Sequence, residues 1–179
     1  MPSNVEIKAR AEDLHRIRKV AEALTDTPPQ LISQEDTFFQ VQSGRLKLRI
    51  FTEGHGELIY YQRRDSAGPR ESRYAIAPVP SPEAIASLLG GALGIVGTVR
   101  KQRTLFLIGQ TRLHLDDVEG LGQFVELEVV LKDGQPISNG VAIAEDLMSR
   151  LGIQPQDLVT AAYLDLLYSR AANAADVTR

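Results

Sequence analysis

Charged residues at every second position of a short apolar segment constrain this chain more than any other feature of its sequence. Arg45, Lys47 and Arg49 alternate with leucine and isoleucine in the segment 45–51. Successive side chains of a β-strand point to opposite faces, so the three cations share one face of a predicted strand. Like charges side by side on a sheet destabilise it. A bound polyanion would offset this repulsion, so the segment predicts an anion site.

The same grouping recurs in four further predicted strands. A polar strand face ordinarily faces water, but five strands with grouped charges favour charged faces that point inward around a ligand. The apolar faces would then point outward against helices, as in a barrel with a polar interior. The grouped residues are Glu6 with Lys8, Lys101 with Arg103, Arg112 with His114 and Asp116, and Glu126 with Glu128.

Other patterns supply the helices that would cover such a barrel. Apolar spacing predicts helices over about residues 13–24 and 143–151, and a last helix from Pro155 to Ser169. Ser81 and Pro82 start another, which is expected to end near Gly90–Gly91. Seven or eight strand-like segments, mostly joined by turns, indicate an α+β fold with a mainly antiparallel sheet. We expect one domain over residues 1–170 and a disordered tail at 171–179.

Composition narrows the class of protein. The 179 residues include no cysteine, which excludes disulfides, thiolate metal sites and cysteine nucleophiles and makes a reducing cytoplasm the default. The net charge of −3 gives no global signature of a nucleic-acid binder. No apolar run approaches the roughly 18–20 residues that a membrane span needs. We therefore expect a cytoplasmic protein with neither nucleic acid nor membrane as a partner.

The grouped faces carry both positive and negative side chains, and this combination restricts the chemical class of ligand further. Basic side chains suit phosphate oxygens, whereas carboxylates repel phosphate unless Mg²⁺ or Mn²⁺ lies between them. A metal–polyphosphate complex satisfies both, and phosphoryl transfer needs mainly positioning and charge neutralisation from a protein. The candidate cations are Lys8, Lys47, Arg49, Arg63, Lys101, Arg103 and Arg112, and the candidate acids are Glu6, Asp116, Glu126 and Glu128.

Segments along nearly the whole chain resemble, in order, motifs of the CYTH superfamily, the triphosphate tunnel metalloenzymes. That superfamily includes class IV adenylyl cyclases, thiamine triphosphatases and inorganic tripolyphosphatases. Glu6-Ile7-Lys8 resembles the end of its ExExK signature, whose first glutamate is Asn4 here. The other segments are Arg45 to Arg49, Tyr61 to Arg63, Arg100 to Arg103, Arg112 to Asp116, Gly122 to Glu128, and Tyr163 to Leu167.

The resemblance implies an eight-stranded antiparallel, tunnel-like β-barrel with a polar interior and helices packed outside. It implies a triphosphate bound inside with Mg²⁺ or Mn²⁺ as cofactor. By motif position, the metal ligands would be Glu6, Asp116, Glu126 and Glu128. The phosphate ligands would be Lys47, Arg49, Arg63, Lys101, Arg103 and Arg112, and the catalytic pair Glu6 and Lys8, with Lys8 touching phosphate or orienting the attacking water.

The resemblance leaves two reactions open. One is adenylyl cyclase-like conversion of ATP to cyclic AMP and pyrophosphate, and the other is hydrolysis of tripolyphosphate, a nucleoside triphosphate or thiamine triphosphate. The amide of Asn4 brings no charge, which leaves one or two metals open. It also motivates the alternative of a non-catalytic binder of polyphosphate or nucleotide. Both a monomer and a homodimer fit the sequence.

Overall fold

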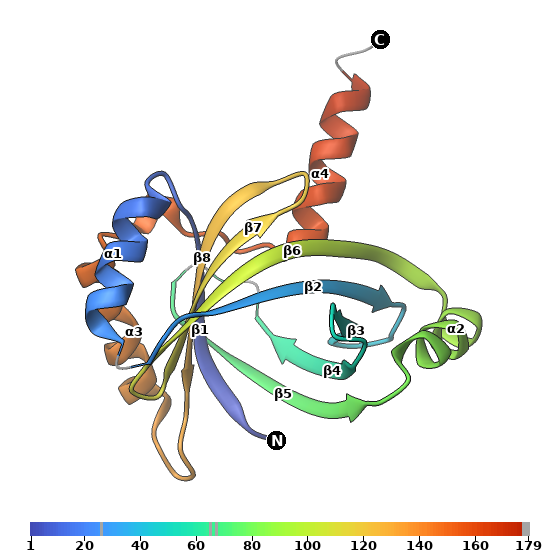
Figure 1. Cartoon of the computed structure of the whole chain (residues 1–179), viewed down its shortest axis with the longest axis horizontal. Coiled ribbons are helices and arrows are strands. Elements are labelled where there is room, and N and C mark those ends of the chain that lie inside the picture. The colour runs from blue at the N-terminus through green and yellow to red at the C-terminus, as the bar shows by residue number, and fades with distance from the viewer. Residues whose placement is uncertain (26, 65, 67, 177–179) are drawn as a thin grey trace.

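Eight strands close into a single antiparallel barrel in the computed structural model, which describes residues 1–179 except 26, 65, 67 and 177–179 (Figure 1). The order around the barrel is β1-β5-β4-β3-β2-β6-β7-β8. This closed barrel confirms the predicted α+β tunnel with helices outside. The strands are β1 Ser3–Arg10, β2 Gln30–Phe39, β3 Arg45–Phe51, β4 Gly56–Arg63, β5 Arg70–Val79, β6 Ile95–Ile108, β7 Thr111–Val118 and β8 Gly122–Val130.

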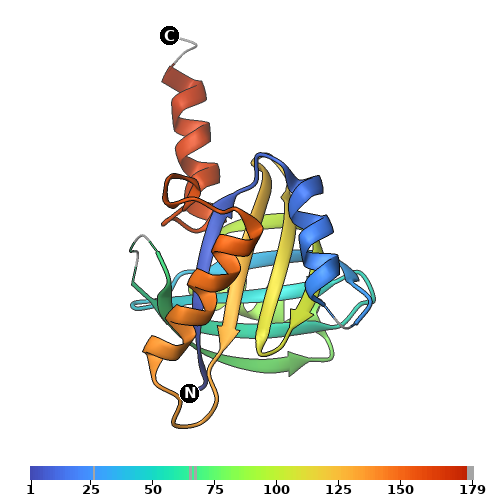
Figure 2. The same ribbon diagram turned by 90° about the vertical axis from the view of Figure 1, so that its left-hand side faces the viewer.

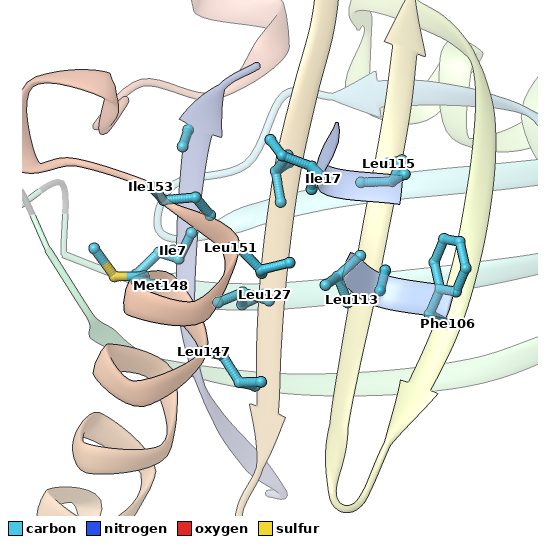
Figure 3. Packing of buried hydrophobic residues seen from close by; sticks show 13 residues of the cluster. Ile7, Ile17, Phe106, Leu113, Leu115, Leu127, Leu147, Met148, Leu151 and Ile153 are labelled. Atoms are coloured by element: carbon cyan, nitrogen blue, oxygen red, sulfur yellow. The ribbon is translucent and has the colours of Figure 1, made fainter. Parts of the chain in front are cut away.

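Helices cover the apolar outer faces of the barrel. Helix α1, Leu14–Leu24, packs on β6 and β7, and helix α3, Ile137–Leu151, packs on β1 and β8 (Figure 2). Their cluster joins outward-facing strand residues such as Ile7, Leu113 and Leu127 to Ile17 and Leu151 from the helices (Figure 3). The hydrophobic free energy gained when the helices bury these side chains is the main reason that the apolar strand faces point outward. The polar faces of the same strands are thereby turned inward.

Helix α2, Pro82–Leu93, covers the outer face around β3. The helix was expected to end near Gly90–Gly91, but it continues to Leu93 and ends at Gly94, whose φ of 81° suits a helix end only for glycine. None of the helices in the described residues is long and apolar enough to cross a membrane.

The segment after α3 departs from the predicted helix over Pro155–Ser169. It forms a 3₁₀ turn, η1 Pro155–Asp157, and then runs extended beside β1. The pairing of β1 with β5 ends at Glu6, so the β1 backbone beyond it has an unpaired edge. The backbone N–H of Val159 donates to the carbonyl of Lys8 at 2.8 Å, which satisfies this edge.

Helix α4, Tyr163–Asp176, starts against the barrel and projects away from it (Figure 1). Its first turn packs Tyr163 and Leu164 against inward-facing Val99 and Phe124. The helix continues through residues 171–176, where the sequence predicted a disordered tail, because alanine is the strongest helix former and dominates this stretch. The remaining tail residues, 177–179, lie outside the described part of the chain.

Candidate active site

The barrel encloses a cavity of about 320 Å³ lined by inward-facing side chains from all eight strands. Strand alternation places them there, since each is two residues from the next along its strand. Most of the predicted site residues meet in this cavity. They are Glu6, Lys8, Lys47, Arg49, Arg63, Arg103, Arg112, Glu126 and Glu128, with His114 beside them.

Strand register places the two acidic side chains of β8 directly opposite polar side chains of β1 and β7. Glu126 of β8 lies opposite Lys8 of β1 on one side and His114 of β7 on the other. Glu128 lies in the same way between Glu6 and Arg112. Directly opposed side chains on one face of a sheet are close enough to interact. The polar interior is therefore a network of cross-strand contacts.

Three side chains offer metal-ligand atoms that lie close together. One ligand atom each from His114, Glu126 and Glu128 falls within 4.8 Å of the others. Burial opposes ionisation of Glu126, but Lys101, Lys8 and Arg103 hold the pKa of its carboxyl well below the ordinary value. Burial, assisted by the Arg103 charge, lowers the pKa of His114 to about 3, so its imidazole is neutral near pH 7.

This donor set fits a divalent cation. Ionised carboxylates and neutral imidazole are the forms that ligate metals. The Nδ1 atom of His114 is also buried and has no hydrogen-bond partner among the described residues. Because buried polar atoms are nearly always satisfied, the atom marks a place where a further partner belongs.

Glu6 lies in the cavity but is engaged by arginines. Its carboxylate accepts a hydrogen bond from Arg63 and lies 3.5 Å from the Nε atom of Arg70. Within the described residues, the close cluster of ligand atoms does not include Glu6. Its predicted metal-binding and catalytic roles therefore stay predictions. The neighbouring Asn4 also lines the cavity, and no partner for its buried Oδ1 atom lies in the part of the chain that the structure describes.

Asp116 and Lys101 lie on the inward faces of β7 and β6 but do not line the cavity. Asp116 is 0% exposed, and its carboxylate accepts hydrogen bonds from Lys101 Nζ at 3.1 Å, from Tyr163 Oη at 3.0 Å and from Arg103 Nε at 2.6 Å. Among the described residues, Asp116 does not join the cluster of ligand atoms. Protein donors surround this carboxylate, and its predicted metal-ligand role stays a prediction. Lys101 likewise faces Asp116 rather than the cavity that the other cations line.

Asp36 of β2 was missed by the sequence analysis. It is 3% exposed and accepts hydrogen bonds from Lys47 Nζ at 2.7 Å and from Arg49 Nε at 2.8 Å. Burial opposes its ionisation, but Arg49 and Lys47 hold the pKa of the Asp36 carboxyl well below the ordinary value. The alternation of Gln34, Asp36 and Phe38 was the available signal, although it mixes polar and apolar residues.

Lys8 is one of the buried basic residues of the cavity, with 4% of the residue exposed. Its Nζ atom lies 3.4 Å from Glu126 Oε1 and 3.7 Å from the centroid of the Tyr163 ring. It also donates to the carbonyl of Ala161 at 3.3 Å. Burial lowers the pKa of Lys8 to about 8, although Glu126 opposes the shift. The residue is therefore mostly an ammonium at pH 7, yet it is far easier to deprotonate than an ordinary lysine.

Solved structures share this fold at low sequence identity. The PH1012 protein from Pyrococcus horikoshii superposes with a TM-score of 0.81 and 23% identity, covering 92% of this chain and 99% of that one. The Hippeastrum protein HpAC1, described as having a dominant triphosphatase activity, superposes with a TM-score of 0.63 and 16% identity, covering 93% of this chain and 95% of that one. At these identities the likeness shows the fold alone.

Sequence comparison gives a curated relative and a family. The adenylate cyclase CyaB of Aeromonas hydrophila is 29% identical over 101 residues, which are 55% of this chain and 52% of the relative. The match thus spans about half the length of that protein. The family model of the CYTH domain matches residues 3–163, which include every strand of the barrel. Because the family model covers most of the chain and the whole closed barrel, the chain belongs to the CYTH family.

Proposed function

We propose that this chain is a divalent-metal-dependent enzyme that binds a triphosphate inside the barrel and catalyses a reaction at one of its phosphorus atoms. One observation carries the proposal: cations from five strands and the Glu126–Glu128 pair converge on one cavity. The cations that line it are Lys8, Lys47, Arg49, Arg63, Arg103 and Arg112. A polyphosphate chain is the small-molecule class that such an arrangement suits.

Arginines and one lysine from β3 and β6, the two strands that flank β2, would hold the phosphate chain. Lys47 and Arg49 on β3 are fixed by Asp36, and Arg103 on β6 is fixed by Asp116. Cations whose positions are already set lose little conformational entropy when they receive a charged ligand. Asp36 engages Nε and Nη2 of Arg49, and Asp116 engages Nε and Nη2 of Arg103, so the Nη1 groups of the two arginines are left to donate to phosphate oxygens. Asp36 and Asp116 thus act as positioning residues.

Glu126 and Glu128 are the residues that would hold the metal, with Glu6 on the adjacent strand as a further candidate. When bound, Mg²⁺ or Mn²⁺ supplies neutralisation of the charge on the phosphate oxygens. Lys8 beside Glu126 is placed to donate to a phosphate oxygen or to orient an attacking water. These roles require Lys8 to reach the reacting phosphorus from the enclosed side of the cavity.

Hydrolysis is the reaction that the geometry supports best. A volume of about 320 Å³ lies at the lower end of ligand pockets, which run from roughly 300 to 1,000 Å³. Such a cavity accommodates a phosphate chain with water and leaves a nucleoside or thiamine group outside. The triphosphatase activity described for HpAC1 supports this reading. The substrate class is then tripolyphosphate or the triphosphate end of ATP or thiamine triphosphate.

Cyclisation of ATP to cyclic AMP and pyrophosphate is the second candidate. It is favoured by the match to the adenylate cyclase of Aeromonas hydrophila. The same cavity would serve if the phosphate chain bound in a different register, so that a ribose hydroxyl met the α-phosphorus. Fold alone does not choose between the two chemistries.

Product analysis tests the proposal. The purified chain is incubated with tripolyphosphate, ATP and thiamine triphosphate, each with Mg²⁺ and with Mn²⁺, and orthophosphate, pyrophosphate and cyclic AMP are measured. We expect orthophosphate from at least one substrate, only with metal, and none from Glu126→Gln. Cyclic AMP with pyrophosphate would establish the second candidate. Triphosphate binding without any product would leave a non-catalytic binder.

A further inference from the structure

We propose that His114 is a direct ligand of the divalent cation at Glu126 and Glu128, which makes a mixed imidazole–carboxylate site that binds first-row transition-metal ions in preference to Mg²⁺. The inference rests on the metal dependence of the proposed function and concerns which residues and which ion that site uses. The proposed function names only carboxylates as the residues that would hold the metal.

The positions of the ligand atoms support a shared ion. The Nδ1 atom of His114 lies 3.9 Å from Glu128 Oε1 and 4.0 Å from Glu126 Oε2. Two atoms that each bind one ion at about 2.1 Å are separated by no more than about 4.2 Å. Both distances therefore allow one ion between imidazole and carboxylate. They are too long for a hydrogen bond between the same atoms.

The burial of His114 gives an independent reason. The side chain is 4% exposed, and its Nδ1 atom is among the few buried side-chain atoms without a hydrogen-bond partner in the described residues. Buried ring nitrogens are ordinarily satisfied by protein or water. This one faces two ionised carboxylates instead, which is the environment of a metal ligand.

Neighbouring arginines orient the two carboxylates. Arg112 contacts Glu128 Oε2, through Nε at 2.9 Å and Nη2 at 2.8 Å, which turns Oε1 toward His114. Arg103 donates to Glu126 Oε2 at 2.6 Å, so this oxygen would be shared between the guanidinium and the ion. A carboxylate oxygen has two lone pairs and can serve both. Such outer contacts are typical of ordered metal sites.

The mixed donor set determines the preferred ion. Mg²⁺ favours oxygen ligands and retains its water, whereas imidazole suits transition-metal ions. Affinity at a given nitrogen and oxygen site rises from Mn²⁺ to Co²⁺. We therefore expect Co²⁺ to bind more tightly than Mn²⁺, and Mn²⁺ more tightly than Mg²⁺.

Pulsed electron paramagnetic resonance of the Mn²⁺-loaded chain detects the imidazole directly. We expect a ¹⁴N hyperfine coupling that changes to ¹⁵N when histidine is labelled with ¹⁵N, a measurement that needs no variant. The coupling should disappear in His114→Gln and persist in His15→Gln, a matched control because His15 is exposed on α1. Calorimetry should show Mn²⁺ and Co²⁺ binding weakened about tenfold or more in His114→Gln, with Mg²⁺ binding much less affected.

The outcomes separate this inference from the proposed function. Wild-type chain that fails to bind Mn²⁺, or binds it without nitrogen coupling, overturns the ligand assignment. So does coupling that persists in His114→Gln. If triphosphate is turned over with metal and no nitrogen coupling is found, the proposed function stands and His114 is not a ligand. Coupling in a chain that releases no product establishes the ligand and removes the enzymatic proposal.

Discussion

The buried carboxylate of Asp116 holds the guanidinium of Arg103 through hydrogen bonds of 2.6 Å to both Nε and Nη2, and this guanidinium also reaches Glu126. Asp116 thus lies behind a phosphate-binding arginine and connects it to the acid that would hold the metal. A residue placed in this way acts through Arg103 rather than on the substrate itself.

Replacing Asp116 by asparagine tests this positioning role. The substitution removes the countercharge of Asp116 from buried Lys101 and Arg103, of which Arg103 keeps Glu126 as a partner. Breaking a buried ion pair costs about 3–5 kcal/mol of unfolding free energy. We expect a lower melting temperature and a higher KM for triphosphate, with unchanged Mn²⁺ affinity. Loss of detectable Mn²⁺ binding, beyond the roughly 10–100-fold fall that loss of a group merely supporting a metal site costs, would instead make Asp116 a ligand.

Arg49→Ala should weaken substrate binding, whereas Glu126→Ala should abolish turnover. Arg49 contributes charged hydrogen bonds to phosphate, each worth about 1.5–3 kcal/mol, so its loss should raise KM about tenfold to hundredfold. Glu126→Ala removes a metal ligand and should abolish turnover at any metal concentration. Steady-state kinetics with metal titrations distinguish the two patterns. Wild-type behaviour in both variants would show that the cavity is not the site.

Triphosphate binding should weaken as the pH rises through about 8. Burial, together with the Arg49 charge, lowers the pKa of Lys47 to about 8, so its ammonium is lost near this pH. Calorimetry with tripolyphosphate across pH 7–9.5 should show the loss. Lys47→Arg should retain more affinity at high pH, with a residual decline because burial also lowers the pKa of Lys8 to about 8. A wild-type affinity that is flat over this range would contradict a role for the two lysines.

The stability of the ligand-free chain should respond to pH in the opposite direction, because it should increase while triphosphate binding weakens. The folded-state pKa of Lys47 lies below the ordinary lysine value of 10.5, so the unfolded chain binds more protons between about pH 8 and 10.5. The contribution of Lys47 to the free energy of unfolding therefore rises with pH across that window. Denaturant unfolding of wild type and Lys47→Met at pH 8 and pH 10 isolates this contribution.

Helix α3 should tolerate no side chain at Gly140. A Cβ atom there would lie 2.7 Å from both Val5 Cγ2 and Leu131 Cδ2. We expect Gly140→Ala to lower the free energy of unfolding by about 1–3 kcal/mol. Gly91→Ala in helix α2 is the control, because no atom lies within 4 Å of its added Cβ. That variant should gain about 0.5–1 kcal/mol, and equal stability of the two variants would contradict the packing of α3 on β1.

The strand positions and the inward direction of the charged faces follow from period-two alternation, so most of the site residues could be named from the sequence. Partners from other elements could not. Arg45 shares the face of Lys47, yet it is held by Asp165 of α4 at 2.7 Å. The enclosure of Asp116 depends on Tyr163, which arrives from the start of the same distant helix. Alternation gives a face but does not say which carboxylate a cation will meet.

His114 is a second residue whose surroundings could not be predicted from strand alternation. Its place on the inner face of β7 follows from Arg112 and Asp116 on the same face. Its enclosure and its unpartnered ring nitrogen depend on how tightly neighbouring strands pack around it. The start of the predicted last helix was misplaced for a related reason, because the edge of β1 that pairs with Val159 exists only in the closed barrel.

A crystal structure of the chain with Mn²⁺ and a non-hydrolysable triphosphate analogue tests the central claim most directly. The account predicts phosphate oxygens within hydrogen-bond distance of Lys47, Arg49 and Arg103 inside the barrel, with Mn²⁺ at Glu126 and Glu128. Phosphates bound only on the outer surface, with the cations still paired to their own carboxylates, would contradict it.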